Sequence, residues 1–238
     1  YNFPTQCPEC STDVVKDDGG AYIRCPNFQC PAQLRERIKY YASRNAMDIE
    51  GVGDKLAEQL VDSGMVCTYA DIYRLNVEQL LELERMGTKS AEKLLANIHD
   101  SKSRGLARLL NALSIRHVGN TVAQVIAKEL GSMNRIRSST LEELSEINEV
   151  GEIIAQSVYD FVHGDIGSNI IEELENVQVH MAVLESDLDG PADARFDGMT
   201  FVVTGKLAQY TRDQIHDLIG QFGGNTSSSV SSKTTFLI

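Results

Sequence analysis

Two pairs of closely spaced cysteines lie near the start of the 238-residue sequence, with a lysine between the pairs. The pairs are Cys7-x-x-Cys10 and Cys25-x-x-x-x-Cys30, and Lys16 begins the string Lys-x-Asp-Gly. Four thiolates at this spacing can surround one metal ion at tetrahedral corners. Lys-x-Asp-Gly is also a string that carries the reactive lysine of nucleotidyl-transferring enzymes. The stretch could therefore serve metal binding, nucleotide transfer or both.

The cysteine spacing favours metal binding. Cys67 is the only other cysteine in a long chain of helical patterns, so a secreted disulfide framework does not fit. We predict a closed structural Zn²⁺ site, ahead of an iron–sulfur site, because the compact ferredoxin run of cysteines is absent. Lys16 is predicted to be a solvated turn residue, because the 14 residues between the two pairs cannot build a nucleotide pocket.

The composition is that of a globular protein, with 42% hydrophobic and 24% charged residues. No apolar run approaches the roughly 20 residues that a membrane-spanning helix needs. The sequence begins with Tyr-Asn-Phe-Pro and ends within a strand-like run, so we expect a piece of a longer protein.

The net charge of −12 is unevenly distributed. Residues 101–138 contain one acid, Glu129, and seven basic residues: Lys102, Arg104, Arg108, Arg116, Lys128, Arg135 and Arg137. Residues 139–195 contain fourteen acids and one base. A basic segment beside an acidic one suits a protein that grips a polyanion on one face, although a solvated run of charges is the alternative.

The middle of the chain is a fourfold repeat. The segments IEGVGDKLAEQL (49–60), LERMGTKSAEKL (83–94), IRHVGNTVAQVI (115–126) and INEVGEIIAQSV (147–158) align without gaps. Around the last glycine of each, apolar residues lie at minus four, minus one and plus seven, and alanine lies at plus four.

Each repeat is predicted to form a helix, a tight glycine hairpin and a second helix. The glycine is expected to provide a backbone angle closed to other residues and a close approach to a ligand. The free N–H groups at the start of the second helix can bind a phosphate. Because aromatic residues are few and tryptophan is absent, duplex backbone binding is favoured over single-strand binding.

The pattern resembles the helix-hairpin-helix motif, which binds the duplex backbone without sequence preference. The predicted DNA-binding residues are Gly51, Val52, Gly53, Lys55, Arg85, Met86, Gly87, Lys89, Arg116, His117, Val118, Gly119, Thr121 and Gly151. The motif's earlier glycine is present only as Gly51. In the fourth repeat, Ile153 stands two residues after the glycine, where the other repeats have Lys55, Lys89 and Thr121, and three glutamates surround the turn, so weaker phosphate contact is expected there.

The last 43 residues predict a strand, a helix and two short strands. MTFVVTGKL (199–207) is the first strand, a helix runs from its N-cap Thr211 to Gly223-Gly224, and NTSSSV and TTFLI are the later strands. The segment resembles the start of a BRCT domain, of which about half would be missing. That resemblance makes Thr204 and Gly205 candidates for a ligand site.

The predicted fold class is multi-domain and mainly α. It consists of a small four-cysteine zinc module, an all-α domain of tandem helix-hairpin-helix units, and a partial α/β BRCT domain. We expect residues 1–6 to end a preceding domain, 7–32 to form the zinc finger and 33–184 the hairpin domain. Residues 185–195, acidic and interrupted by Gly-Pro, read as a linker before the BRCT segment at 196–238.

In this order, the modules resemble the C-terminal half of a bacterial NAD-dependent DNA ligase, an enzyme that seals nicks in duplex DNA during replication and repair. The resemblance implies that the NAD and Mg²⁺ sites and the adenylated lysine lie in adenylation and oligonucleotide-binding domains outside this chain. The chain itself would contain no catalytic or NAD-binding residue. It would be a monomeric clamp on nicked duplex DNA in the bacterial cytoplasm, associated with the nucleoid.

Two other classes of protein remain open from the residues. One is a non-catalytic protein, or a nuclease subunit, that binds DNA structures through tandem hairpins. The other is a scaffold that uses the BRCT segment for protein contacts and has no duplex affinity in residues 31–184.

Overall fold

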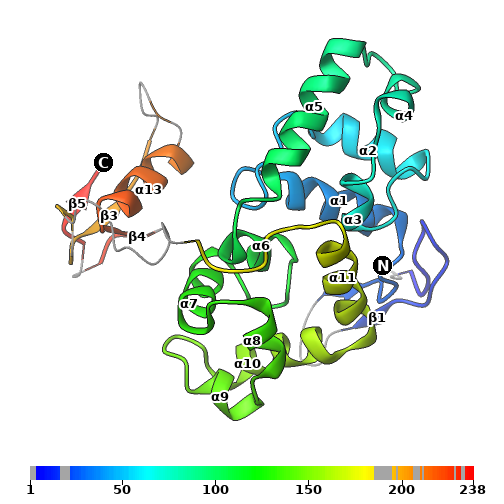
Figure 1. Ribbon diagram of the computed structural model, residues 1–238. Helices are drawn as coiled ribbons and strands as arrows, with labels where there is room; N and C mark the ends of the chain where they lie inside the picture. Colours follow the sequence, from blue (N-terminus) through cyan, green and yellow to red (C-terminus); the bar gives the residue numbers. More distant parts are fainter. Residues whose placement is uncertain are drawn as a thin grey trace. The chain divides into compact units, whose positions relative to one another are not determined.

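The computed structural model describes residues 4–16, 22–184, 195–196, 198–205, 210, 212–227, 229–231 and 234–238. The chain divides into two compact units, Tyr1–Val183 and Leu184–Ile238 (Figure 1). Of the predicted linker at 185–195, only Arg195 lies within the described residues.

A two-stranded hairpin follows the first cysteine pair. Strand β1 (Val15–Lys16) pairs antiparallel with β2 (Ile23–Arg24), and Lys16 lies opposite Ile23. Lys16 is an exposed strand residue, and the rest of its Lys-x-Asp-Gly string lies outside the described residues.

Helices make up the remainder of the first unit. They are α1 (Pro31–Ala42), α2 (Asp54–Asp62), α3 (Tyr69–Ile72), α4 (Val77–Leu81), α5 (Thr88–Ser101), α6 (Leu106–Ala112), α7 (Asn120–Leu130), α8 (Met133–Ser138), α9 (Leu141–Ser145), α10 (Glu152–His163) and α11 (Asp165–Asn176).

The four repeats form four helical hairpins, as predicted. Hairpins 1 and 2, α1–α2 and α4–α5, make up the first hairpin pair; hairpins 3 and 4, α6–α7 and α9–α10, make up the second pair (Figure 1). In each hairpin, the second helix begins directly after the last glycine of the repeat. Hairpin 1 differs in having a longer connection, residues 43–53, between its helices.

The repeat's apolar positions form the core that holds the hairpins together. The alanines at plus four and the aliphatic residues at plus seven are buried, with exposed fractions of 4% or less: Ala57, Ala91, Ala123, Ala155, Leu60, Leu94, Ile126 and Val158. They belong to one continuous cluster of buried residues that extends from Leu34 to Val179. Each fully buried Leu, Ile or Val side chain contributes about 1.5–3 kcal/mol to folding, so this stripe explains why the pattern recurs.

The second unit contains a small parallel sheet. β3 (Thr200–Val202) is central, with β4 (Asn225–Ser227) and β5 (Phe236–Leu237) parallel to it on either side. Helix α13 (Arg212–Gln221) lies between β3 and β4 in the chain and is followed by Gly223, whose φ of +80° suits glycine. The predicted order of strand, helix and two strands is confirmed, whereas Thr211 lies outside the described residues.

Candidate metal centre and nucleic-acid interface

The four cysteines of the first module converge on one point. Their Sγ atoms all lie within 4.8 Å of one another, with Cys7 3.8 Å from Cys30 and Cys10 3.5 Å from Cys25. Four sulfurs at about 2.3 Å from a tetrahedral ion would be about 3.8 Å apart, whereas a disulfide needs about 2.05 Å. The cluster therefore fits a closed structural Zn²⁺ site and not a pair of disulfides.

The thiols of the cluster differ in acidity. Hydrogen bonding to Thr12 lowers the pKa of the Cys10 thiol to about 6. Desolvation by burial raises the pKa of Cys25 to about 12, and burial raises the pKa of Cys30 as well. In the absence of a cation, the cluster thus holds protons at neutral pH. A metal ion must displace these protons to bind four thiolates, so its affinity should rise with pH.

The cysteine module is attached to α1 by side chains of that helix. Cys30 is the N-cap of α1, Gln33 Nε2 donates to the Cys25 carbonyl at 2.6 Å, and Arg35 pairs with Glu9 at 2.9 Å. Arg37 donates to the Phe28 carbonyl and lies 3.5 Å from the centroid of that residue's ring. The module is therefore fixed to the hairpin domain through the first turns of one helix.

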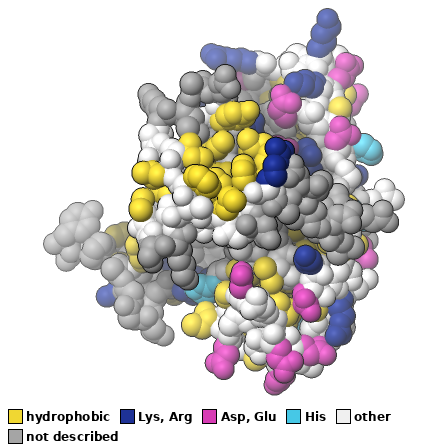
Figure 2. Space-filling model, turned by 90° about the vertical axis from the view of Figure 1, so that its left-hand side faces the viewer, with side chains coloured by type: hydrophobic (Ala, Val, Ile, Leu, Met, Phe, Trp, Pro, Cys, Tyr) yellow, Lys and Arg dark blue, Asp and Glu magenta, His cyan; other side chains and the backbone are white. Residues whose placement is uncertain are grey.

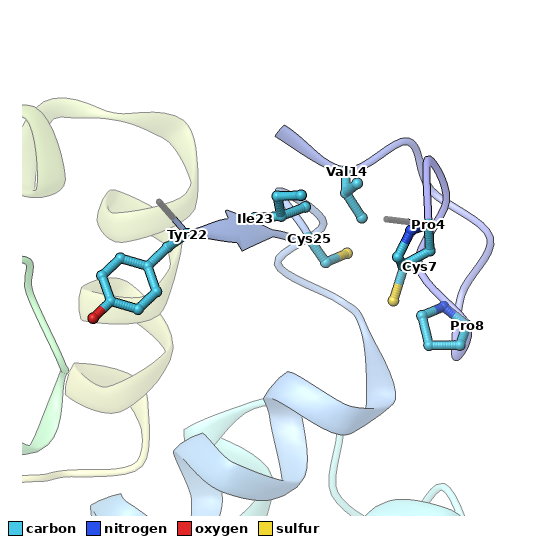
Figure 3. Close-up of a pocket in the computed structure, with 7 residues that line it drawn as sticks. All are labelled: Pro4, Cys7, Pro8, Val14, Tyr22, Ile23 and Cys25. Carbon is cyan, nitrogen blue, oxygen red and sulfur yellow. The ribbon is translucent and has the colours of Figure 1, made fainter. Parts of the chain in front are cut away.

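A shallow hollow of about 350 Å³ lies beside the cysteines (Figure 3). Its lining residues are Pro4, Cys7, Pro8, Val14, Tyr22, Ile23 and Cys25. The Tyr22 ring points away from the thiols in this view, and 78% of the residue is exposed. Among the described residues, this lining contains no carboxylate, lysine or histidine.

The turn before each second helix has the same hydrogen bond four times. The N–H of the residue at minus one donates to the carbonyl at minus four: Val52 to Ile49, Met86 to Leu83, Val118 to Ile115 and Val150 to Ile147. The residue at minus two takes a positive φ in every hairpin, +104° at Gly51, +61° at Arg85, +67° at His117 and +65° at Glu149. The repeat is therefore a repeat of backbone geometry as well as of sequence.

The prediction that the last glycine of the repeat provides a backbone angle closed to other residues is wrong. Gly53, Gly87, Gly119 and Gly151 have φ between −77° and −102°, which any residue can adopt. The left-handed angle falls two residues earlier, where only the first hairpin has a glycine. A Cβ built on any of the four last glycines would meet no protein atom within 4 Å. The fold itself therefore does not require glycine there for space or backbone angle, and the open space at each glycine leaves room for an external ligand to approach.

These glycines also leave the helix starts uncapped. At α4, α8 and α9, side chains cap the helix start: Asn76 accepts from the Gln79 N–H, Ser132 from the Arg135 N–H and Thr140 from the Glu143 N–H. Helices α6 and α11 have a glycine N-cap without a side-chain cap. At the four hairpin helices, the glycine N-cap supplies no side-chain acceptor. The first N–H groups of an α-helix have no partner within the helix. Each hairpin therefore presents free donors at the positive end of a helix dipole.

The polar and charged side chains predicted to contact DNA around these helix starts are exposed, whereas Val52 and Val118 are buried and Met86 is half-buried. Lys55 and Lys89 follow Gly53 and Gly87 by two residues, and the Lys55 side chain is 91% exposed with an ion pair to Glu58. Arg116, His117 and Thr121 are exposed at hairpin 3. The equivalent residue of hairpin 4, Ile153, is 70% exposed and offers no charge or hydrogen bond.

Four of the seven basic residues of segment 101–138 are not left free for a ligand. Arg104, Arg108, Arg135 and Arg137 instead bond to other parts of the chain; Arg135, for example, pairs with Glu143 and Arg137 with Glu172. On the face drawn in Figure 2, basic side chains lie among acidic ones. The count of charges in the sequence therefore overstated the charge available to a ligand.

Thr204 and Gly205, the candidate ligand residues of the BRCT segment, follow β3 and are exposed. The Thr204 N–H and hydroxyl both lie within hydrogen-bond distance of the Ile238 carbonyl, at 2.5 and 3.4 Å. Gly205 has a φ of +75°. Among the described residues, no helix is long and apolar enough to cross a membrane.

Four family models match four successive segments of the chain. Residues 6–32 match the NAD-dependent DNA ligase C4 zinc finger domain, and residues 192–238 match the BRCA1 C Terminus (BRCT) domain. Residues 43–100 match the SAM-like helix-hairpin-helix tandem, and residues 108–171 match the helix-hairpin-helix motif.

Similarity to curated proteins covers the whole chain. A DNA ligase of Rhodopirellula baltica is 42% identical over all of this chain, and one of Koribacter versatilis is 44% identical over the same extent. A DNA ligase of Geotalea uraniireducens is 44% identical over 99% of it. The chain spans 34% to 36% of the length of these proteins. With its ligase-type zinc finger, paired hairpin segments and BRCT segment, the chain belongs to the NAD-dependent DNA ligase family, as a C-terminal part of such a protein.

Proposed function

We propose that this chain is the part of an NAD-dependent DNA ligase that grips duplex DNA around a nick. The observation that carries the proposal is the set of glycine-capped helix starts, which combine free N–H donors with open space at each glycine. A phosphate at each of these points would be bound through the backbone, so the grip would be independent of base sequence. Gly51, Val52, Arg85, Met86 and Val118 would lie along the same turns.

The contribution of the four hairpins would be unequal. Hairpins 1 to 3 have Lys55, Lys89 and Thr121 two residues after the glycine, where each can add a contact to the phosphate. At hairpin 4, Ile153 cannot do so, and the Ile154 N–H already donates to the Gly151 carbonyl at 3.0 Å. Hairpin 4 would therefore bind phosphate most weakly.

The zinc site would have a structural role. Cys7, Cys10, Cys25 and Cys30 would hold Zn²⁺ in a closed shell with no open position for water or substrate. When bound, the ion would supply only cross-linking between the two cysteine loops and the start of α1.

The chemistry of the parent enzyme would take place in other domains. NAD, Mg²⁺ and the adenylated lysine would belong to adenylation and oligonucleotide-binding domains, and this chain would position nicked DNA for them. Correct positioning supplies a large part of the barrier reduction in phosphoryl-type transfer. We further propose that the protein is monomeric and acts in the bacterial cytoplasm at the nucleoid. Thr204 and Gly205 remain the candidate ligand residues of the BRCT segment.

The proposal is tested by measuring the affinity of the chain for nicked and intact duplexes of unrelated sequence over a range of salt concentrations. Equal affinity for all sequences is expected, with log K falling by about 0.9 per log unit of salt for each phosphate that the chain binds. Lys89→Glu should weaken binding to every sequence and flatten this slope. Lys128→Glu, at the opposite end of α7 from its glycine, is the matched charge control and should have a smaller effect. A sequence-selective loss, or no duplex binding by the wild type, would refute the proposal.

A further inference from the structure

The two hairpin pairs are joined by a group of polar contacts that the phosphate-binding turns do not include. The donors lie on and just before α6, the first helix of the second pair. The acceptors are mainly backbone carbonyls of residues 44–48, in the connection that leads from α1 to the glycine turn of hairpin 1.

Arg108 makes the most direct link. Its Nη1 donates to the carbonyl of Arg44 at 2.8 Å and to that of Ala46 at 2.9 Å. Arg104 Nη2 pairs with the Asp48 carboxylate at 3.0 Å. One nitrogen of the planar guanidinium of Arg108 thus bonds both carbonyls, and the planar group is less free to reorient than a lysine ammonium would be.

Asn111 completes the link from a buried position. Its Nδ2 donates to the Asn45 carbonyl at 2.7 Å, and its Oδ1 accepts from the Tyr40 hydroxyl of α1 at 3.0 Å. Only 1% of Asn111 is exposed. A buried amide whose donor and acceptor both bond across an interface specifies one arrangement of the two elements, because other arrangements would leave these groups unpaired.

We propose that Arg104, Arg108 and Asn111 are positioning residues that hold the first hairpin pair at a fixed placement relative to the second pair. The proposal rests on the proposed function, because a fixed placement matters if both pairs engage one duplex. When one pair has bound, the other then faces the same duplex at high effective concentration. Loosening the link lowers that concentration without removing a phosphate contact.

Asn111→Ala tests this proposal, because the residue is uncharged and too buried to touch DNA. Spin labels on the exposed Cys67 of the first pair and on Glu129→Cys of the second pair report the distance between the pairs in the zinc-loaded chain. We expect the variant to have a broader distance distribution and roughly tenfold weaker duplex binding. Its salt slope should be unchanged, whereas a residue that contacts phosphate would flatten it.

Arg108→Ala is the second variant, for the case that Asn111→Ala does not fold. Its control is Arg135→Ala, which removes the same charge from an ion pair inside the second hairpin pair. An unchanged distance distribution in the Asn111 and Arg108 variants would overturn the proposal, as would a broadened distribution with wild-type affinity. Failure of the wild type to bind duplex would instead refute the proposed function, while the distance measurement still tests the link between the pairs.

Discussion

Replacing the glycines at the hairpin helix starts by alanine should separate folding from duplex binding. Gly53, Gly87 and Gly119 have ordinary φ angles, and a Cβ would meet no protein atom within 4 Å. Alanine lowers the conformational entropy of the unfolded chain, which stabilises the folded protein by about 0.4–1 kcal/mol. Alanine is also a poorer N-cap than glycine, which destabilises the folded protein by a similar free energy. Each variant should therefore stay within about 1 kcal/mol of the wild type, a change of a few degrees in Tm.

The effect on DNA should be much larger. The added methyl group occupies the space above the free N–H groups and keeps a phosphate from reaching them. Hydrogen bonds to charged groups contribute about 1.5–3 kcal/mol each, so losing one weakens binding about 10- to 150-fold. The assay is duplex titration against salt, combined with thermal unfolding of each variant. The slope should fall by about 0.9 for each phosphate that a variant no longer binds.

Two further glycine variants serve as controls. Gly151→Ala should change binding little, because hairpin 4 is expected to hold phosphate weakly. Gly167→Ala should destabilise the fold, because its Cβ would overlap the Phe161 carbonyl oxygen. Wild-type DNA affinity in the combined variant of hairpins 1 to 3, at an unchanged Tm, would refute the assignment of these glycines to phosphate binding. A loss of affinity that is fully explained by unfolding would refute it as well.

Three other predictions concern the zinc, the tyrosines and the lysine string. Removing zinc with a chelator should expose residues up to Cys30 to proteolysis while circular dichroism retains most of the helix signal, and global helix loss would contradict this. Burial raises the pKa of Tyr69 to about 12 and that of Tyr41 well above its usual value. Because the folded state favours the neutral phenols, their contribution to the free energy of unfolding is full below pH 10. It is lost as the pH rises toward 12. The raised pKa of Tyr69 alone should lower the stability by about 1 kcal/mol at pH 11, and Tyr69→Phe should reduce this loss in unfolding experiments. Incubation with NAD should leave no adenylate on Lys16 by mass spectrometry.

The sequence was sufficient to predict the positions that the fold buries. Alanine at plus four and the aliphatic residue at plus seven are buried in every hairpin, because the same helix packing recurs. The chain therefore shows the same sequence pattern four times. The cysteine cluster was equally predictable from the sequence, because metal geometry restricts the spacing of its ligands.

What the sequence could not predict depends on contacts between distant residues. Arg85, His117 and Glu149 adopt φ of 61° to 67°, within the left-handed region that residues other than glycine can enter at a cost. The motif glycine could therefore be replaced without loss of the turn. Gly51 has a φ of +104° and a Cβ position 3.2 Å from Leu94, so its glycine is required by the fold. Arg108 was counted as surface charge, although its guanidinium bonds carbonyls 62 and 64 residues away.

The central claim is that the starts of the hairpin helices hold the phosphates of duplex DNA. Its most direct test is to follow the backbone amide resonances of the isotope-labelled chain during titration with a short duplex. We expect the largest shifts at residues 54–56, 88–90 and 120–122, just after the glycines, and smaller shifts at 152–154. Shifts confined to the zinc module or to residues 195–238, with these amides unchanged, would contradict the account.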